Sequence, residues 1–378
     1  MLRILVVGAG TIAQSVHLPA ISQDPNTDLV GVVDISPIRA QALSQAYGVP
    51  HFPSLEVALS EIQVDAVILC VPGEQAGLAE QALTAGLHVL SEKPLALSPH
   101  RARELGDLAM LRDLVLWVGY MKMEDPILQS GRALLERIGE VQLVVMKVHH
   151  PADETATAHV RLFPAGGEDP ARVADLVAAN EAALTQVLGP DHESFRRLYA
   201  DVMMGSVVHQ FSVLRALGYK PPTSYFHADA WPWPAHGRPP NLLAVGKLVH
   251  ESNPRTPITR VVIEWVWGQD APAYTESIEF VGSGGTLRID LAAPYLLEAA
   301  SKLTIGLNGP TGHVSEIQFG DHFGSYRHQL TNFVHAITGD GPITSTAAGA
   351  AADAEASIAF VRAVAATFQV TLGGEDSL

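Results

Sequence analysis

The residues with the clearest chemical potential lie close to the amino terminus. A β-branched run at residues 2–7 ends in the hexapeptide GAGTIA at residues 8–13, which has the G-x-G-x-x-A spacing of a dinucleotide-binding turn. Gly8 permits a tight turn out of the strand, Gly10 lets a pyrophosphate approach the backbone, and Ala13 lets the next helix pack closely. A plain strand-to-helix turn is the alternative interpretation. The dinucleotide interpretation assigns cofactor binding to Gly8, Gly10, Thr11, Ile12 and Ala13.

A carboxylate follows the second apolar run at the spacing that a dinucleotide site needs. Residues 29–33 form a short strand pattern that ends at Asp34, which lies 34 − 10 = 24 residues beyond Gly10. A carboxylate at this position accepts hydrogen bonds from the adenosine ribose hydroxyls and repels a 2′-phosphate. We therefore expect NAD, with NADP possible because Arg39 can soften this preference. The alternative interpretation of Arg39 is an exposed helix residue.

These groups require a parallel sheet to bring them together. Residues 64–71 form a third strand pattern that ends at Val71 and Pro72, and residues 88–90 form a fourth that leads into Glu92 and Lys93. Helical patterns of about ten to fifteen residues separate these strands, which is typical of a doubly wound sheet that binds ligands at the carboxyl ends of its strands. The glycine turn, Asp34, Val71-Pro72 and Glu92-Lys93 all follow such ends.

Composition and charge exclude several classes of protein. The chain has 378 residues, enough for about two domains. Its net charge of −16, without a basic run longer than Arg196-Arg197, argues against nucleic acid as a partner. No apolar stretch approaches the roughly 20 residues of a membrane helix. Cys70 is the only cysteine, so we expect no disulfide and an inert core thiol.

The amino-terminal apolar stretch bears on location. Residues 4–7 are apolar only briefly before Gly8, and this run is too short for the core of a signal peptide. We therefore expect a cytoplasmic protein.

The pattern changes after about residue 120. Alternating runs with few helices between the later ones predict an antiparallel sheet of about six strands. We expect an α/β chain with a dinucleotide-binding Rossmann domain at residues 1–120 and an α+β domain at 121–378, which includes a helical insertion at about 152–204. The predicted strands of the second domain are residues 141–149, 242–251, 258–267, 277–281, 286–289 and 314–319.

Together, the motifs resemble the glucose-fructose oxidoreductase / inositol dehydrogenase / MocA (Gfo/Idh/MocA) family of NAD(P)-dependent oxidoreductases. The resemblance continues into the second half of the chain and is weakest between about 151 and 204. The ordered motifs are the turn at residues 8–13, His17-Leu18-Pro19-Ala20, Asp34, Val71-Pro72, Ala85-Gly86-x-His88-Val89, Glu92-Lys93-Pro94, residues 282–287 and the helix at 326–337.

The resemblance implies roles for two further residues. Lys93 would hold a substrate oxygen beside the nicotinamide, and Glu92 would position this lysine or contact the nicotinamide side. His209 matches a family histidine that handles the substrate proton. The family aspartate one turn earlier is replaced by Gly205, and a glycine inside a helix suggests that substrate or nicotinamide uses the space. Asp201 is too distant along a helix to replace it.

Several other residues are candidates for substrate contact. Tyr120 lies at the expected end of the first domain, and Trp231 lies in a stiff proline-rich aromatic loop that suits a sugar ring or a subunit contact. Neighbouring strand residues point to opposite faces, so His149 and His150 do not indicate a metal site. The remaining candidates are His159, Arg161, Trp233 and His236.

These observations lead to one main hypothesis and two alternatives. The resemblance implies hydride transfer between NAD(P) and a secondary alcohol or ketone of a sugar, cyclitol or related polyol. It also implies a homodimer or homotetramer formed through the open sheet face. The alternatives are a cofactor-retaining lyase or hydrolase that works through transient oxidation, and a non-catalytic dinucleotide-binding protein. Gly205, and Ala76 in place of another histidine often found in the family, motivate these alternatives.

Overall fold

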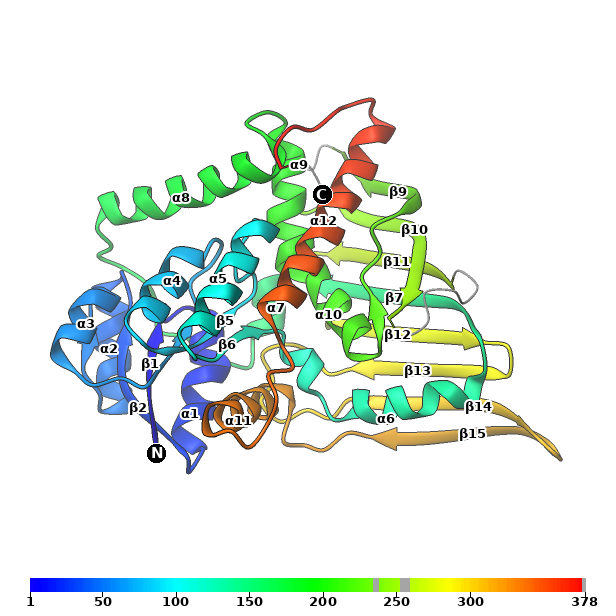
Figure 1. Cartoon of the computed structure of the whole chain (residues 1–378), viewed down its shortest axis with the longest axis horizontal. Helices are drawn as coiled ribbons and strands as arrows, with labels where there is room; N and C mark the ends of the chain where they lie inside the picture. The colour runs from blue at the N-terminus through cyan, green and yellow to red at the C-terminus, as the bar shows by residue number, and fades with distance from the viewer. Residues whose placement is uncertain (234–237, 252–258, 376–378) are drawn as a thin grey trace. The chain divides into compact units, whose positions relative to one another are not determined.

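The computed structural model describes residues 1–233, 238–251 and 259–375, and its chain forms two compact units (Figure 1). Residues 160–187, from the middle of the chain, belong to the first unit. The division of the sequence into domains at residue 120 stays a prediction. Unit 1 comprises Met1–Tyr120, Val160–Val187 and Tyr326–Ala351, and unit 2 comprises Met121–His159, Leu188–Ser325 and Ala352–Leu378.

Unit 1 contains the predicted parallel sheet. Its six strands have the order β3-β2-β1-β4-β5-β6, and every neighbouring pair is parallel. The chain moves outward from β1 to β3 and then returns to place β4 on the other side of β1. This reversal creates a switch point, where ligands of doubly wound sheets bind. The strands are β1 (Leu2–Val7), β2 (Thr27–Val33), β3 (His51–Phe52), β4 (Ala66–Leu69), β5 (His88–Glu92) and β6 (Leu116–Gly119).

Serine caps start three of the helices of unit 1. Ser36, Ser54 and Ser98 each accept a hydrogen bond from the backbone N–H three residues ahead, at 3.4, 3.3 and 3.2 Å. Such caps satisfy a backbone donor that the first helical turn leaves unpaired. The helices are α1 (Leu18–Gln23), α2 (Pro37–Tyr47), α3 (Leu55–Glu61), α4 (Ala76–Thr84), α5 (Pro99–Leu111), α8 (Pro170–Leu188) and α11 (Ser325–Thr338).

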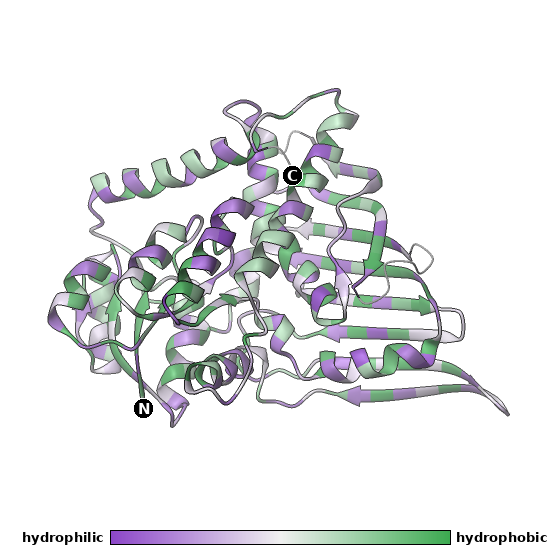
Figure 2. Ribbon diagram, in the orientation of Figure 1, coloured by the Kyte–Doolittle hydropathy of each residue, from purple (hydrophilic) through white to green (hydrophobic). Residues whose placement is uncertain are grey.

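Unit 2 contains a nine-stranded, mostly antiparallel sheet within the described residues. The predicted sheet type is confirmed, but the expected number of about six strands is wrong, and β7 pairs with β11 in parallel. Buried and partly exposed positions alternate along strands such as Asn241–His250 and Thr259–Gly268, and Figure 2 shows hydrophobic and hydrophilic residues along the sheet. The strands are β7 (Val141–Pro151), β8 (Tyr219–Lys220), β9 (Tyr225–Trp231), β10 (Asn241–His250), β11 (Thr259–Gly268), β12 (Thr275–Gly282), β13 (Gly285–Leu291), β14 (Lys302–Gly309) and β15 (Gly312–Phe319).

The strands that the sequence pattern missed have weak intrinsic signals. β14 contains Gly306 and Gly309, and β9 contains Asp229 between two alanines. These residue types are depleted in strands because they pack little surface on a pleated sheet. Pairing with β13 and β10 supplies the hydrogen bonds and cross-strand contacts that local propensity does not.

The predicted helical insertion at 152–204 is only partly helical. Residues 158–169 lack regular secondary structure, and Leu198–Val207 form a π-helical stretch that leads directly into α10. No helix within the described residues is long and apolar enough to cross a membrane. The helices of this part of the chain and of the rest of unit 2 are α6 (Ile127–Leu134), α7 (Asp153–Thr157), α9 (Glu193–Arg197), α10 (Val208–Ala216) and α12 (Ala347–Thr367).

A buried ion pair joins α10 to α12. Arg215 donates from Nε and Nη2 to the two carboxylate oxygens of Asp353, at 2.9 and 2.8 Å, and the Asp353 side chain is 0% exposed. Removing one partner of a buried pair leaves a charge without its compensation. We expect Asp353→Ala to lower the free energy of unfolding by about 3–5 kcal/mol, measured as a lower denaturant midpoint at unchanged slope.

The matched control for Asp353→Ala is another bidentate pair on the surface. Arg137 binds both carboxylate oxygens of Glu316, but both side chains are 41% exposed. Glu316→Ala should leave the midpoint unchanged because water screens exposed pairs. Equal effects of the two substitutions would contradict the assigned importance of burial.

Candidate functional site

The glycine turn has the geometry that a phosphate-binding backbone needs. Gly8 has a φ of +85°, and a Cβ on it would lie 2.9 Å from the Cys70 carbonyl carbon and from Val71, so a side chain is excluded. A Cβ at Gly10 would meet only the guanidinium of Arg39, at 3.8 Å, within 4 Å. Ala13 is fully buried beneath the turn. The turn therefore presents open backbone at Gly10 and a closely packed helix behind it, and Thr11 and Ile12 begin that helix.

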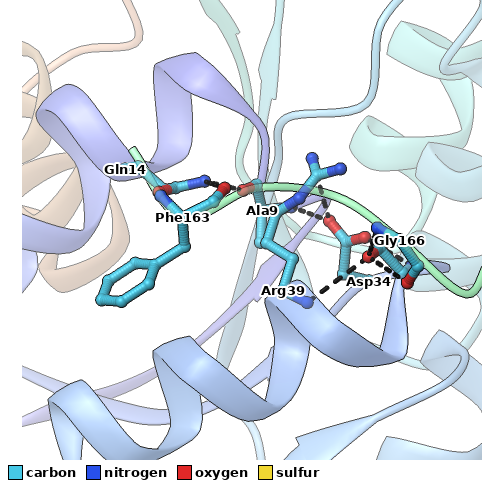
Figure 3. Close-up of polar contacts among 7 residues, drawn as sticks. Ala9, Gln14, Asp34, Arg39, Phe163 and Gly166 are labelled. Atoms are coloured by element: carbon cyan, nitrogen blue, oxygen red, sulfur yellow. Dashed lines mark hydrogen bonds and ion pairs between the residues drawn. The ribbon is translucent and has the colours of Figure 1, made fainter. Parts of the chain in front are cut away.

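Asp34 is held next to this turn by backbone donors. The Ala9 N–H donates to Oδ2 and the Ser36 N–H donates to Oδ1, both at 2.7 Å. Arg39 places Nη1 3.8 Å from Oδ2 (Figure 3). The carboxylate thus lies at the carboxyl end of β2, where it can accept ribose hydroxyls, and Arg39 offers a positive charge beside it. Both residues lie where the sequence predicted them relative to the glycine turn.

Val71 and Pro72 follow β4 on the other side of the switch point. Val71 contacts the turn at the position that a Gly8 side chain would occupy, and Pro72 is exposed. Cys70 is buried, and burial raises the pKa of its thiol well above the ordinary value. The expected location of this thiol in the core is confirmed.

Glu92 has a partner that the sequence did not reveal. Its Oε1 lies 2.8 Å from Nε2 of His17, and its Oε2 accepts a hydrogen bond from the Lys93 N–H at 3.2 Å. The side chains of Glu92 and His17 are both buried. The Tyr326 ring packs edge-on against His17. Gly119 provides room for the carboxylate, because a Cβ there would lie 3.0 Å from the Glu92 carboxyl carbon. Glu92 therefore orients His17 and the backbone of the following residue.

Lys93 begins the segment that leaves β5. It is partly buried, and the Lys93-Pro94 peptide bond is cis. Burial lowers the pKa of its ammonium below the ordinary value, although the nearby Glu92 carboxylate opposes this shift. A lysine in such surroundings gives up its proton more readily than a surface lysine, which suits hydrogen-bond donation to a reacting oxygen.

In unit 2, His209 lies in the first turn of α10, directly after the π-helical stretch. It is 9% exposed, and its carbonyl accepts from the Ser212 hydroxyl. A Cβ at Gly205 would meet only the Ala200 carbonyl oxygen, at 3.5 Å, so packing within the chain does not require glycine. Asp201 is exposed and pairs with Arg197 at 3.4 Å, so it does not replace the missing aspartate.

A buried polar network next to His209 was not predicted. Gln210 donates to Oε1 of Glu276 at 2.8 Å, and Oε2 of the same carboxylate forms an ion pair with Lys122 and accepts from the Tyr274 hydroxyl. Lys122 also donates to the Tyr274 hydroxyl, and burial raises the pKa of this tyrosine. The network ties α10 to β12 and to the turn at Met121–Glu124. No local sequence pattern marks these four residues as partners.

The remaining candidates lie at several places. Tyr120 is fully buried after β6, and His149 is half-exposed and pairs with Glu264, whereas His150 packs against Trp265 and Tyr274. No group of three His, Cys, Asp or Glu residues in the described ranges is arranged to hold a metal ion. Trp231 is exposed at the end of β9, and Trp233 stacks on Phe195 and Phe368. His159 forms a hydrogen bond with the Tyr295 carbonyl, and Arg161 is exposed. His236 lies outside the described residues.

Known proteins resemble part of this chain in sequence. Residues 2–120 match the family described as "Oxidoreductase family, NAD-binding Rossmann fold". Inositol 2-dehydrogenase of Rhizobium meliloti is 31% identical over 153 residues, which are 40% of this chain and 46% of that protein. UDP-N-acetylglucosamine 3-dehydrogenase of Acidithiobacillus ferrooxidans is 35% identical over 134 residues, which are 35% and 41% of the two chains. The matched region thus spans less than half of these relatives.

Solved structures resemble the chain over nearly its whole length. The 3-ketoreductase KijD10 from Actinomadura kijaniata, crystallised with NADP, has a TM-score of 0.62 at 18% identity and covers 97% of both chains. The dehydrogenase GnnA from Acidithiobacillus ferrooxidans has a TM-score of 0.67 at 20% identity, with 96% of this chain and 98% of that chain covered. These TM-scores establish a shared fold. Residues 2–120 are thus similar to the Gfo/Idh/MocA oxidoreductase family with its NAD-binding Rossmann fold, the family that the motifs resemble.

Proposed function

We propose that this protein is an NAD(P)-dependent oxidoreductase that transfers hydride between nicotinamide and a secondary alcohol or ketone of a sugar, cyclitol or related polyol. The observation that carries the proposal is the carboxyl edge of the unit 1 sheet. There, Gly8 is sterically required, Gly10 is open, and Asp34 is held beside both by the Ala9 N–H. Relatives named as inositol and sugar dehydrogenases support the polyol class.

The residues at this edge fit a dinucleotide without further cations. Gly10 and the helix that starts at Thr11 offer backbone N–H groups to the pyrophosphate, and Asp34 accepts from the adenosine ribose. A chain with a net charge of −16 must hold phosphate in this way, through backbone donors and a helix end. When bound, the nicotinamide supplies the hydride acceptor for alcohol oxidation or the donor for ketone reduction.

Two side chains carry the proton chemistry in this proposal. Lys93 donates a hydrogen bond to the reacting oxygen and stabilises the negative charge that develops on it. His209 accepts the hydroxyl proton while the hydrogen on the same carbon leaves as hydride, so the products are the ketone and a protonated imidazole. Glu92 acts on Lys93 through the backbone, since its carboxylate accepts the Lys93 N–H. Tyr120, Gly205, His149 and Trp231 stay candidates for substrate contact.

One observation favours a second reaction class. Gly205 occupies the position of the aspartate that would assist His209. Asp201 is exposed and forms an ion pair with Arg197. A lyase or hydrolase that oxidises its substrate transiently would regenerate its cofactor in each turnover. Net accumulation of NADH during turnover would exclude this alternative, whereas product formation without NADH would support it.

We also propose that copies of the chain associate through the open face and edge of the unit 2 sheet. The edge strand β15 carries Ile317 and Phe319, whose exposed fractions are 55% and 70%. Apolar side chains exposed together on an edge strand favour contact with another surface. A homodimer or homotetramer would cover them.

The first prediction concerns the choice of dinucleotide. Because the Asp34 carboxylate repels a 2′-phosphate, we expect NADH to bind at least about tenfold more tightly than NADPH, as measured by nicotinamide fluorescence. Asp34→Ser should reduce this ratio, and Arg39→Ala should weaken NADPH binding alone. Asp28→Asn, which changes an exposed carboxylate on the same strand, is the control. If the ratio of NADH affinity to NADPH affinity were the same in wild type and in Asp34→Ser, the assignment of Asp34 to the ribose would be contradicted.

The second prediction concerns Lys93 and His209. Lys93→Met and His209→Ala should each lower kcat by about 10²–10⁴-fold while NADH affinity stays close to wild type. The pKa of Lys93 is lowered, so the protonated form is lost as pH rises through a value below 10.5, and kcat/KM should fall there. Lys93→Arg should move that loss to higher pH. Lys220→Met, at an exposed lysine, is the control. Full activity in Lys93→Met or in His209→Ala would contradict the proposed mechanism.

The third prediction concerns Gly205 and distinguishes an effect on protein stability from an effect on ligand binding beside this residue. Alanine fits without a clash, so Gly205→Ala should raise the free energy of unfolding by about 0.5–1 kcal/mol through helix propensity. If substrate or nicotinamide approaches the backbone there, the same variant should also have a higher KM. A stabilised variant with unchanged KM and kcat would show that no ligand uses this space.

A further inference from the structure

Residues 160–183, which we call the strap, are attached to unit 1 without a core of their own. None of these residues is buried, although Leu184, Val187 and Leu188 immediately after them are. Val173, Leu176 and Val177 on α8 have exposed fractions of 39%, 39% and 57%. Segments that bury little apolar surface open at low free energy compared with the rest of the fold. The strap is therefore held in place mainly by polar contacts.

Those contacts are made with the residues that follow the dinucleotide motifs. The Phe163 N–H donates to Oε1 of Gln14 at 2.7 Å, and the Gln14 amide donates back to the Phe163 carbonyl at 3.4 Å. The Gly166 N–H donates to the Ser36 hydroxyl at 2.8 Å, and that hydroxyl donates to the Gly166 carbonyl at 2.9 Å. Figure 3 shows the strap passing from Gln14 across Ala9 to Asp34.

Two glycines allow this close approach. A Cβ at Gly166 would lie 2.8 Å from Cδ1 of Ile38, and a Cβ at Gly167 would lie 3.0 Å from Cγ of Pro37. Gly167 also has a φ of +77°, which side chains rarely adopt. The backbone of the strap therefore lies directly on the first turn of α2, two to four residues beyond Asp34.

The strap also reaches the other side of the switch point. Asn180 on α8 places its Oδ1 2.6 Å from where a Cβ of Gly73 would be, and Gly73 follows Pro72. Contacts at Gln14, Ser36 and Gly73 thus follow β1, β2 and β4 respectively. The strap crosses the carboxyl ends of the three strands that flank the switch point.

The strap flanks the candidate ribose-binding carboxylate. The Asp34 side chain is only 5% exposed. Ribose hydroxyls must contact this group if it binds a dinucleotide, and the strap contacts Ser36 on one side of it and Gln14 on the other. Breaking the polar contacts of residues 163 and 166 would uncover this edge without exposing a buried side chain of the strap.

We propose that the strap is a gate on the dinucleotide site, and that the cofactor enters and leaves only when the strap lifts from Gln14 and Ser36. The proposal rests on the proposed function, since it assumes a dinucleotide at Asp34. It makes residues 160–183 part of the cofactor site and predicts that gate opening limits cofactor exchange. In wild type, the observed rate of NADH binding should reach a plateau as NADH concentration rises, because opening precedes binding.

A reversible crosslink provides the direct test. A Cβ at Gly166 would lie 3.9 Å from the Ile38 Cβ, within the roughly 3.5–4.5 Å range of disulfides. In the double variant Ile38→Cys with Gly166→Cys, oxidation should slow NADH association about 100-fold or more, because the open fraction falls accordingly. Dithiothreitol should restore the rate of the reduced double variant. Each single cysteine variant is a control, and the native Cys70 is buried.

A second variant tests whether opening the strap speeds NADH association. Gly167→Val forces a side chain against Pro37 at an unfavourable φ, so it should lift the strap and raise the plateau rate. Thr84→Val, at an exposed residue of α4 outside the strap, should leave the rate at the wild-type value. Stopped-flow nicotinamide fluorescence measures all of these rates.

The outcomes separate this proposal from the proposed function. Wild-type association rates in both the oxidised double variant and Gly167→Val would overturn the gate while leaving the dinucleotide site intact. Failure of wild type to bind either NADH or NADPH would instead overturn the proposed function, and the gate with it. Slow association on oxidation, recovery on reduction and faster binding in Gly167→Val would support the gate.

Discussion

The burial of the Asp34 carboxylate is the interaction on which the candidate cofactor site depends. A buried charge is costly unless hydrogen bonds compensate it, and here the N–H groups of Ala9 and Ser36 do so. The Ala9 bond ties the glycine turn to the end of β2. The Ser36 bond ties the same carboxylate to the start of α2. One side chain thus determines how the turn, the second strand and its helix meet at the carboxyl edge of the sheet.

The same requirement to compensate buried charge organises unit 2. Lys122 and Glu276 are both almost completely buried, so each needs the other, and Tyr274 and Gln210 satisfy the remaining carboxylate lone pairs. Because Gln210 follows His209, this network restrains the first turn of α10, which carries the histidine. The Arg215 to Asp353 pair restrains its last turn. The helix that carries His209 is therefore held near both ends by buried polar partners.

Stability is distributed unevenly around the cofactor edge, and this distribution has a functional consequence. The strands beneath it are buried, with Val67 and Ile68 of β4 fully excluded from water. The strap above it buries none of its residues between 160 and 183. A well-packed sheet can keep the geometry of a site precise, while a weakly held segment beside it allows the ligand to exchange.

The sequence by itself determined the features that depend on neighbouring residues. The glycine turn, the carboxylate at the end of the second strand, the parallel sheet of unit 1 and the cysteine buried after β4 follow from spacing, turn chemistry and short apolar runs. Each of these signals lies within a few tens of residues. The second sheet was predicted in type but not in extent, because β9 and β14 have weak local propensity, β8 has only two residues, and all three strands are completed by their partners.

Only the tertiary structure decided which distant residues meet. Phe163 contacts Gln14 across 149 positions, and Lys122 contacts Tyr274 across 152. His17 meets Glu92 across 75 positions. Hydrogen-bonding side chains carry no local mark of their distant partner, since any donor can pair with any acceptor that folding brings within reach. For this reason the sequence identified the dinucleotide motifs, whereas the strap over them and the network beside His209 became visible only in the folded chain.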